Sequence, residues 1–250
     1  MTKPIDLKEK FPHLSKAPIV EAALDMRVVP SVKWDETTLP NILKERLSDF
    51  PKIETLREAR VQIPPPGKED NPSFEDVCVG FKLYSSDNLN IVQFNKGAYV
   101  FSRLKPYKSW GYFSQEALRL WSIYCELLKP TEVRRIGLRF INKISIKQET
   151  VEFADYYKYP PESLKDLNWP LNGYLHHDVM RVPETAYSVN LIKTIQNVPG
   201  EIGLILDIDV FMQSQFAYDK LRIECLEEMR WVKNKIFFSS LTDKILSELK

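Results

Sequence analysis

The chain has 250 residues, of which 44% are hydrophobic and 28% are charged, so it can bury a substantial core in one large domain or two small ones. Its 35 lysines and arginines balance 34 aspartates and glutamates. The formal net charge of +1 excludes a bulk positive field that would draw the protein to DNA or to an anionic membrane. Only local clusters of charge remain as candidate sites for such partners.

Residues 1–16 form a polar, charged lead-in without the apolar segment of a secretory signal. No apolar run approaches the roughly 18–20 residues that a membrane span needs. The cysteines, Cys78, Cys125 and Cys225, are odd in number and far apart, which indicates buried free thiols rather than disulfides or metal ligands. We therefore expect a soluble, cytoplasmic protein with no membrane partner.

The first half of the chain, 17–130, predicts a strand, a helix, three strands and a long helix. Alternating apolar and charged residues mark the first strand, Ile19 to Val29, and a helix follows it up to Phe50. The three further strands are expected at Lys52 to Ile63, Val77 to Leu83 and Ile91 to Leu104. We expect the last of them to bend or bulge near Gly97. Apolar residues at three- and four-residue spacing predict the long helix, which starts at Trp110.

The second half, 131–250, repeats this order. A strand is expected over Glu132 to Ile146, and a short helix between Val151 and Leu167, which Pro160-Pro161 interrupts. Three more strands are expected at Tyr174 to Arg181, Ala186 to Gln196 and Glu201 to Met212. A final helix should run from about Ala217 and restart near Thr242.

Helices that follow runs of strands favour an α+β fold with an antiparallel sheet over βαβ crossovers. We expect a duplicated βαβββα unit that forms one compact domain. Its curved, mainly antiparallel sheet would have about eight strands, with two long helices on one face. This arrangement is similar to the duplicated saddle of TATA-binding-protein-like and helix-grip folds, a similarity that implies no particular chemistry.

Three of the predicted strands carry an unusually charged second face. Its charged residues are Glu21, Asp25, Arg27, Arg135, Arg139, Lys143, Asp207 and Asp209. Arginine recognises carboxylates and phosphates with two parallel hydrogen bonds, so this face is a candidate site for an anionic ligand. Cross-strand ion pairs that only hold the sheet together explain the same pattern, at about 0.2–1 kcal/mol each.

Other candidate sites are weaker. Asp207 and Asp209 share a strand face, but no third ligand with a telling spacing accompanies them, so we predict no metal. His176 and His177 are adjacent on a strand and point to opposite faces, so they cannot chelate one ion together. The chain has neither a nucleophile-elbow motif nor a phosphate-binding glycine loop. We assign no catalytic residue and no cofactor, and whether the protein is an enzyme stays open.

Two aromatic stretches need a separate interpretation. Residues 103–110 interleave basic and aromatic side chains, which suits either base stacking or a strand-to-helix corner whose Tyr107 and Trp110 fill the core; we favour the corner. The C-terminal helix carries Trp231, Phe237 and Phe238, more aromatic surface than one helix face can bury. We therefore expect a partner or dimer interface there.

Several motifs along the chain resemble those of one sporadically distributed family of bacterial and archaeal proteins that has no established activity. The motifs are Ala17–Ala22 (APIVEA), Phe101–Tyr107 with Trp110, Arg135–Asn142 (RIGLRFIN), Leu206–Asp209 (LDID) and Ile236–Thr242. The resemblance covers about residues 14 to 245. The patchy distribution of the family is similar to that of mobile or defence-associated genes, which implies a role of that kind.

Together these observations favour a binding or regulatory protein that holds a protein partner or a second copy of itself. The resemblance adds a defence or toxin–antitoxin setting. The alternative is an enzyme or sensor that binds a phosphate- or carboxylate-bearing small molecule on the charged face. A third hypothesis, nucleic-acid binding across the saddle, is disfavoured because carboxylates lie on the face that would meet phosphates.

Overall fold

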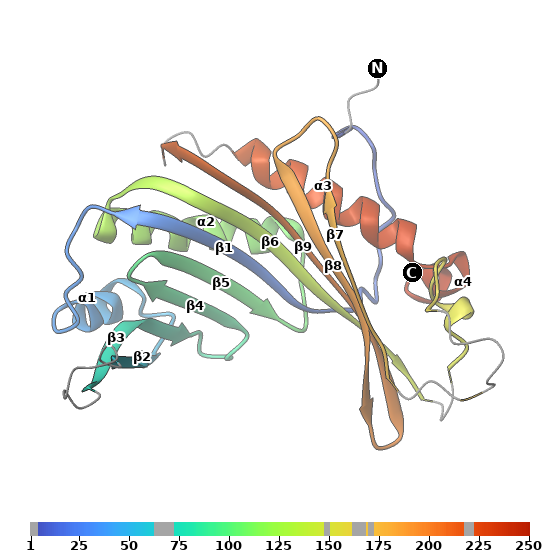
Figure 1. The fold of residues 1–250 in the computed structure, drawn as a ribbon, viewed down its shortest axis with the longest axis horizontal. Coiled ribbons are helices and arrows are strands. Elements are labelled where there is room, and N and C mark those ends of the chain that lie inside the picture. The colour runs from blue at the N-terminus through green and yellow to red at the C-terminus, as the bar shows by residue number, and fades with distance from the viewer. Residues whose placement is uncertain (1–4, 63–72, 148–150, 162–168, 170–172, 218–222) are drawn as a thin grey trace, which may run out of the picture.

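The computed structural model describes the chain except residues 1–4, 63–72, 148–150, 162–168, 170–172 and 218–222. The described residues form a nine-stranded open sheet, antiparallel throughout, and four α-helices (Figure 1). The strands are β1 (Ile19–Pro30), β2 (Lys52–Gln62), β3 (Ser73–Tyr84), β4 (Asn90–Asn95), β5 (Ala98–Leu104), β6 (Pro130–Ile146), β7 (Leu175–Arg181), β8 (Tyr187–Val198) and β9 (Glu201–Ala217). The helices are α1 (Leu39–Arg46), α2 (Trp110–Leu128), α3 (Ile223–Ser240) and α4 (Asp243–Glu248).

The two halves of the chain join in the middle of one sheet. The strand order is β2-β3-β4-β5-β1-β6-β9-β8-β7, so the first strand of each half, β1 and β6, are neighbours. On either side lies the last strand of the same half, β5 beside β1 and β9 beside β6. The α+β fold and the antiparallel sheet that we predicted are therefore confirmed, with nine strands rather than about eight.

The two long helices, α2 and α3, lie on the same face of the sheet (Figure 1). The hydrophobic core lies between the helices and the sheet. The even-numbered residues of β1 contribute fully buried side chains to it, namely Ala22, Leu24 and Met26. The predicted stripe of α2 is buried against them, at Phe113, Ala117, Leu120, Trp121, Tyr124 and Leu128. The strands, with apolar residues at every second position, and the helix, with apolar residues every three or four positions, bury their apolar sides against each other. No described helix covers the other face of the sheet, which we call the open face (Figure 1).

The strand-to-helix corner packs as predicted. The ring of Tyr107 lies 5.8 Å from that of Phe140, and the ring of Trp110 lies 5.9 Å from that of Phe113 (centroid distances). Both side chains are partly buried against the core. Their packing favours the corner over a base-stacking surface.

Two elements of the structure differ from the predicted ones. The long fourth strand is two strands, β4 and β5, because the chain reverses completely at Lys96 and Gly97 and pairs Asn95 with Ala98. The helix expected within 151–167 is only a 3-10 turn at Phe153–Asp155, and residues 162–168 lie outside the described part. After that turn the backbone of Tyr157 pairs with Leu241 instead of continuing a helix.

The C-terminal helix restarts where expected. At its expected start, Ala217 still belongs to β9; α3 is described from Ile223, and residues 218–222 lie outside the described part. Thr242 caps α4, since its side-chain oxygen accepts a hydrogen bond from the backbone N–H of Ile245 at 3.4 Å. Of the helices that the structure describes, none combines the length and the apolar character that a membrane crossing requires.

Candidate functional site on the open sheet face

The uncovered face of the sheet collects the charged residues of β1, β6 and β9. Cross-strand pairing sets Arg27 beside Arg135 and Arg139 beside Asp209. The alternation of side chains then puts Asp25 on the same face, next to the position of Gly137. The register, which the sequence could not supply, decides which charges meet.

Arg135 is the centre of the most buried charge cluster. Its guanidinium donates one hydrogen bond to Asp25 and another to Asp209, the latter with Nη2 to Oδ2 at 2.9 Å. The side chain of Arg135 is only 17% exposed, and the guanidinium also lies 5.2 Å from the ring centroid of Phe211. Asp209 accepts a further hydrogen bond from Asn190 Nδ2 at 3.3 Å. We call Asp25, Arg135 and Asp209 the Arg135 triad.

Gly137 makes room for the Arg135 triad. A Cβ atom on Gly137 would lie 2.3 Å from Arg135 Nη1, well inside van der Waals contact. The guanidinium therefore occupies the space where a side chain at position 137 would stand, between Asp25 on β1 and Phe211 on β9. Glycine in the interior of a strand commonly marks such a close approach.

Two further ion pairs continue along the same face. Arg139 Nε donates to both carboxylate oxygens of Asp207, at 2.9 and 3.1 Å, and this hydrogen bonding raises the pKa of Arg139. Lys143 Nζ lies 2.9 Å from Glu201, and the hydrogen bond from Lys143 lowers the pKa of Glu201. The charged residues of this face thus mostly neutralise one another.

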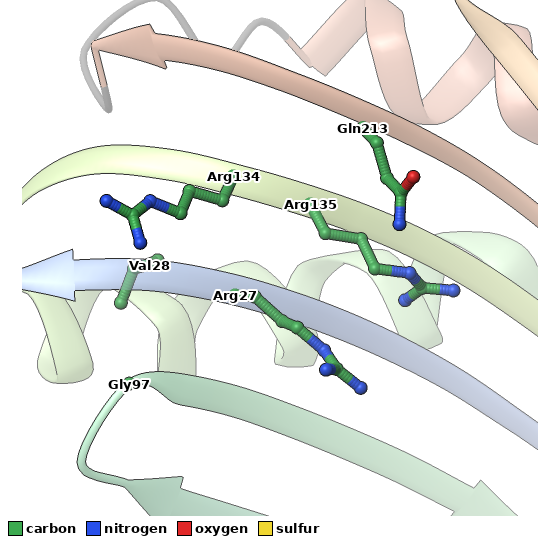
Figure 2. Close-up of a pocket in the computed structure, with 6 residues that line it drawn as sticks. All are labelled: Arg27, Val28, Gly97, Arg134, Arg135 and Gln213. Atoms are coloured by element: carbon green, nitrogen blue, oxygen red, sulfur yellow. The ribbon is translucent and has the colours of Figure 1, made fainter.

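Arg27 is the exception. It is exposed, and its side chain makes no ion pair or hydrogen bond with any residue of the described part of the chain. It lines a hollow of about 470 Å³ together with Val28, Gly97, Arg134, Arg135 and Gln213 (Figure 2). Figure 2 shows the guanidinium groups of Arg27 and Arg135 pointing the same way along the face, with the Gln213 side chain directed toward them from β9.

The other two arginines of the hollow already have partners. Arg135 belongs to the triad, and Arg134 Nε donates to Glu132 at 2.8 Å. Arg134 sits at an irregularity in the pairing of β6 with β9, between Val133 and Arg135. The sequence analysis missed Arg134, Gln213 and Glu201, because strict alternation does not reveal where a strand slips register or how far β9 extends.

Glu21 completes the predicted set of charged residues. It lies on β1 and makes no ion pair within the described ranges, although its charge acts on Arg139. The structure therefore places the predicted residues on one face. Six of them belong to the Arg135 triad, the Arg139–Asp207 pair and the Lys143–Glu201 pair, whereas Arg27 and Glu21 have no ion-pair partner among the described residues. Only Arg27 and Arg135 of the predicted set line the hollow.

The aromatic residues of α3 are packed against other parts of the chain. Phe237 is buried in the core, and the N-terminal segment places Phe11 against Phe238, with ring centroids 5.4 Å apart and nearly parallel. Phe11 also makes an edge contact with Trp231. The predicted polar lead-in thus covers much of the surface that we assigned to a partner, and Glu9 joins it with an ion pair to Lys235 at 2.7 Å.

The remaining reactive side chains do not converge. No three of the described His, Cys, Asp and Glu residues are arranged to hold a metal ion. His176 pairs with Asp178 at 2.9 Å, whereas His177 points toward Asn190 on the other face. Cys78 is buried, and burial raises the pKa of Cys125 to about 12, which keeps that thiol protonated and unreactive.

The chain matches no protein-family model, and no curated protein is significantly similar to it in sequence.

Proposed function

We propose that this protein is a non-enzymatic binding protein that holds an anionic group of its ligand at Arg27. The observation that carries the proposal is a fully available guanidinium at the wall of a hollow, on a face where the neighbouring charges are already satisfied. An unpaired arginine gains two charge-assisted hydrogen bonds from a phosphate or carboxylate without breaking an existing pair.

The composition of the hollow supports binding rather than catalysis. Its polar side chains are three arginines and Gln213, which can donate hydrogen bonds to a ligand. No nucleophile or general base lines it, so a bound molecule would be recognised rather than transformed. A volume of about 470 Å³ lies within the range of small-molecule pockets. We therefore favour a phosphate- or carboxylate-bearing small molecule, and a protein partner with an acidic group is the second candidate.

The charge pattern argues against a nucleic-acid ligand. Asp25, Asp207 and Asp209 interrupt the arginines on the same face, and a phosphate backbone would meet them directly. Nucleic-acid affinity depends on neutralising many phosphates with basic side chains. Here Arg135 and Arg139 already form ion pairs with carboxylates of the same face.

We also propose that the two halves of the chain are a duplication that forms a saddle like that of TATA-binding-protein-like folds. In each half the first strand lies at the centre of the sheet, the last strand lies beside it, and a long helix follows. The second half differs in having four strands instead of five and, in its described part, no counterpart of α1. The regulatory, defence-associated setting of the protein is proposed on the family resemblance alone.

Calorimetric titration with inorganic pyrophosphate and with succinate tests the anion site. Loss of the charge-assisted hydrogen bonds of Arg27 should weaken binding about 10- to 100-fold, since such bonds contribute about 1.5–3 kcal/mol. The test variant is Arg27→Ala. The matched control is Arg60→Ala, which removes the same exposed charge from β2, at the edge of the sheet. Equal affinity of the Arg27→Ala variant and the wild-type protein, or no binding of either anion, would contradict the proposal.

A further inference from the structure

We propose that strand β7 is the contact through which two copies of this chain pair edge to edge, in an antiparallel, two-fold symmetric dimer with one continuous sheet. β7 is the last strand of the sheet and is bonded to β8 alone (Figure 1). Its side chains are exposed along almost the whole strand. A strand in this position presents a row of backbone donors and acceptors to any partner strand.

The outward backbone groups of β7 follow from its register with β8. The N–H of Val182 donates to the carbonyl of Tyr187 at 2.9 Å, and the antiparallel ladder continues from there without a shift. Hydrogen-bonded pairs alternate in such a ladder, so residues 176, 178 and 180 bond to β8. The N–H and C=O groups of residues 175, 177, 179 and 181 therefore point away from the sheet, and within the described ranges they have no partner.

Strand β2, at the opposite edge of the sheet, has features that hinder pairing with a second chain. Strand β2 carries the charges of Lys52, Glu54, Arg57, Glu58 and Arg60, and its pairing with β3 shifts register near Arg57. Charges and irregular pairing are the usual devices that keep edge strands from associating.

β7 has neither of these protections. It is regular, and it exposes Leu175 by 73% and Val179 by 68% on the open face of the sheet. Its charged side chains are only Asp178 and Arg181, apart from the two histidines.

The sequence of β7 is complementary to itself in one antiparallel register. When two copies pair around His177, Leu175 of each faces Val179 of the other, and His176 of each faces Asp178 of the other. The first contact is apolar, and the second brings the His176 imidazole of one copy beside the Asp178 carboxylate of the other, in place of the His176–Asp178 contact at 2.9 Å within one chain. A two-fold axis perpendicular to the sheet keeps equivalent side chains on the same face, so all these contacts form twice.

The hydrogen-bond pattern agrees with that register. Residue 177 is an outward-facing position, so it forms a hydrogen-bonded pair with its own copy, and residues 175 and 179 form the next pairs. His176 and Asp178 then belong to non-hydrogen-bonded pairs, in which side chains approach most closely.

Neighbouring registers are less favourable. Pairing around Asp178 sets two aspartates directly opposite each other, which is destabilising. Pairing around Val179 places His177 opposite Arg181 and Asp178 opposite Met180. In that register neither Arg181 nor Asp178 lies opposite a residue of the opposite charge. The register around His177 is thus favoured by charge as well as by apolar contact, and a second copy of this chain is the partner that fits.

Light scattering coupled to size-exclusion chromatography, over protein concentrations from about 1 to 200 μM, measures whether the dimer forms. We expect a dimer whose dissociation constant rises at least tenfold in Val179→Lys. The matched control is Val61→Lys, the same change at an exposed valine of the β2 edge, which should leave the dimer unchanged. A monomer at every concentration, or a dimer that Val179→Lys does not weaken, would overturn the proposal.

Cysteine cross-linking tests the register itself. In a non-hydrogen-bonded antiparallel pair the Cα atoms are about 4.5 Å apart, within disulfide range, so an equimolar mixture of the His176→Cys and Asp178→Cys proteins should form a covalent heterodimer with oxidised glutathione. Each variant alone places its cysteine opposite an unchanged Asp178 or His176 of the second copy and should cross-link far less. The wild-type protein, with Cys78 buried and Cys125 and Cys225 partly buried, is the background control. Cross-linking of either variant alone that equals that of the mixture would refute the proposed register.

Discussion

Replacement of Arg135 by methionine should destabilise the protein by about 3 kcal/mol at neutral pH. The methionine keeps an apolar stem over the strand but removes the cation that contacts both Asp25 and Asp209. Those carboxylates have exposed fractions of only 24% and 16%, so water replaces the lost guanidinium poorly. Two neighbouring carboxylates would then be left facing each other without a counter-charge.

The magnitude follows from the degree of burial. Removal of one partner from a fully buried ion pair costs about 3–5 kcal/mol, whereas an exposed pair contributes about 0–1 kcal/mol. The Arg135 triad lies between these limits and involves two carboxylates, which places the expected loss at about 2–4 kcal/mol. The adjacent residue provides a matched control, because Arg134 is 59% exposed and pairs with Glu132 at the surface. Arg134→Met should therefore change the free energy of unfolding by no more than about 0.5–1 kcal/mol.

Urea unfolding followed by circular dichroism measures both variants at the same pH and salt concentration. The triple variant Asp25→Asn, Arg135→Met, Asp209→Asn should recover most of the loss, because it removes the unpaired charges along with their partner. Equal losses in Arg135→Met and Arg134→Met would refute the reasoning. A triple variant as unstable as the single one would show instead that packing, and not charge, explains the effect.

Two further substitutions test neighbouring features. Gly137→Ala should displace the guanidinium of Arg135 from its carboxylates and lower the free energy of unfolding in urea by about 1–2 kcal/mol. This loss should exceed the roughly 0.5–1 kcal/mol by which alanine is favoured over glycine inside a strand. A variant more stable than the wild-type protein would contradict this account. Burial, aided by the charge of Arg230, lowers the pKa of Lys233 to about 7, with Nζ 4.2 Å from the ring centroid of Phe140. The ordinary pKa of this lysine is 10.5, so the unfolded state binds more protons between pH 7 and 10, and wild-type stability should rise over that range by about 3 kcal/mol. Lys233→Met should lack this rise in unfolding experiments at pH 7 and 9.5, and parallel profiles of the two proteins would contradict the prediction.

The charged face was predictable from the sequence, and its pairing was not. Alternation of apolar and charged residues has a period of two, which assigns Arg135, Arg139 and Asp209 to one face without any knowledge of the fold. Which carboxylate meets which arginine depends on the relative register of strands that are about 70 residues apart in sequence, as in Arg139 with Asp207. Register is a property of the assembled sheet, because each strand alone is compatible with several alignments.

The errors in the predicted elements have local causes. The segment from Ile91 to Leu104 alternates apolar and polar residues on both sides of Lys96 and Gly97, and this two-residue reversal is too short to interrupt the strand pattern strongly. The composition of the first residues predicts a polar lead-in, although Phe11 and the Glu9–Lys235 ion pair hold the segment on α3, and Ile5 and Leu14 pack against the core. Such scattered anchoring side chains give no periodic signal, so sequence patterns cannot detect them.

The open face and the β7 edge are independent parts of the molecule. Arg27 lies on β1, in the middle of the sheet, and β6, β9 and β8 separate it from β7. A two-fold axis perpendicular to the sheet would leave both open faces uncovered and on the same side of the dimer. Pairing of two chains would therefore not occupy the hollow, and an anion at Arg27 would not meet the second copy. Each variant thus serves as the control of the other: Arg27→Ala should keep the dimer, and Val179→Lys should keep the affinity for pyrophosphate. If either variant lost both properties, general damage to the sheet would explain the result better than two separate sites.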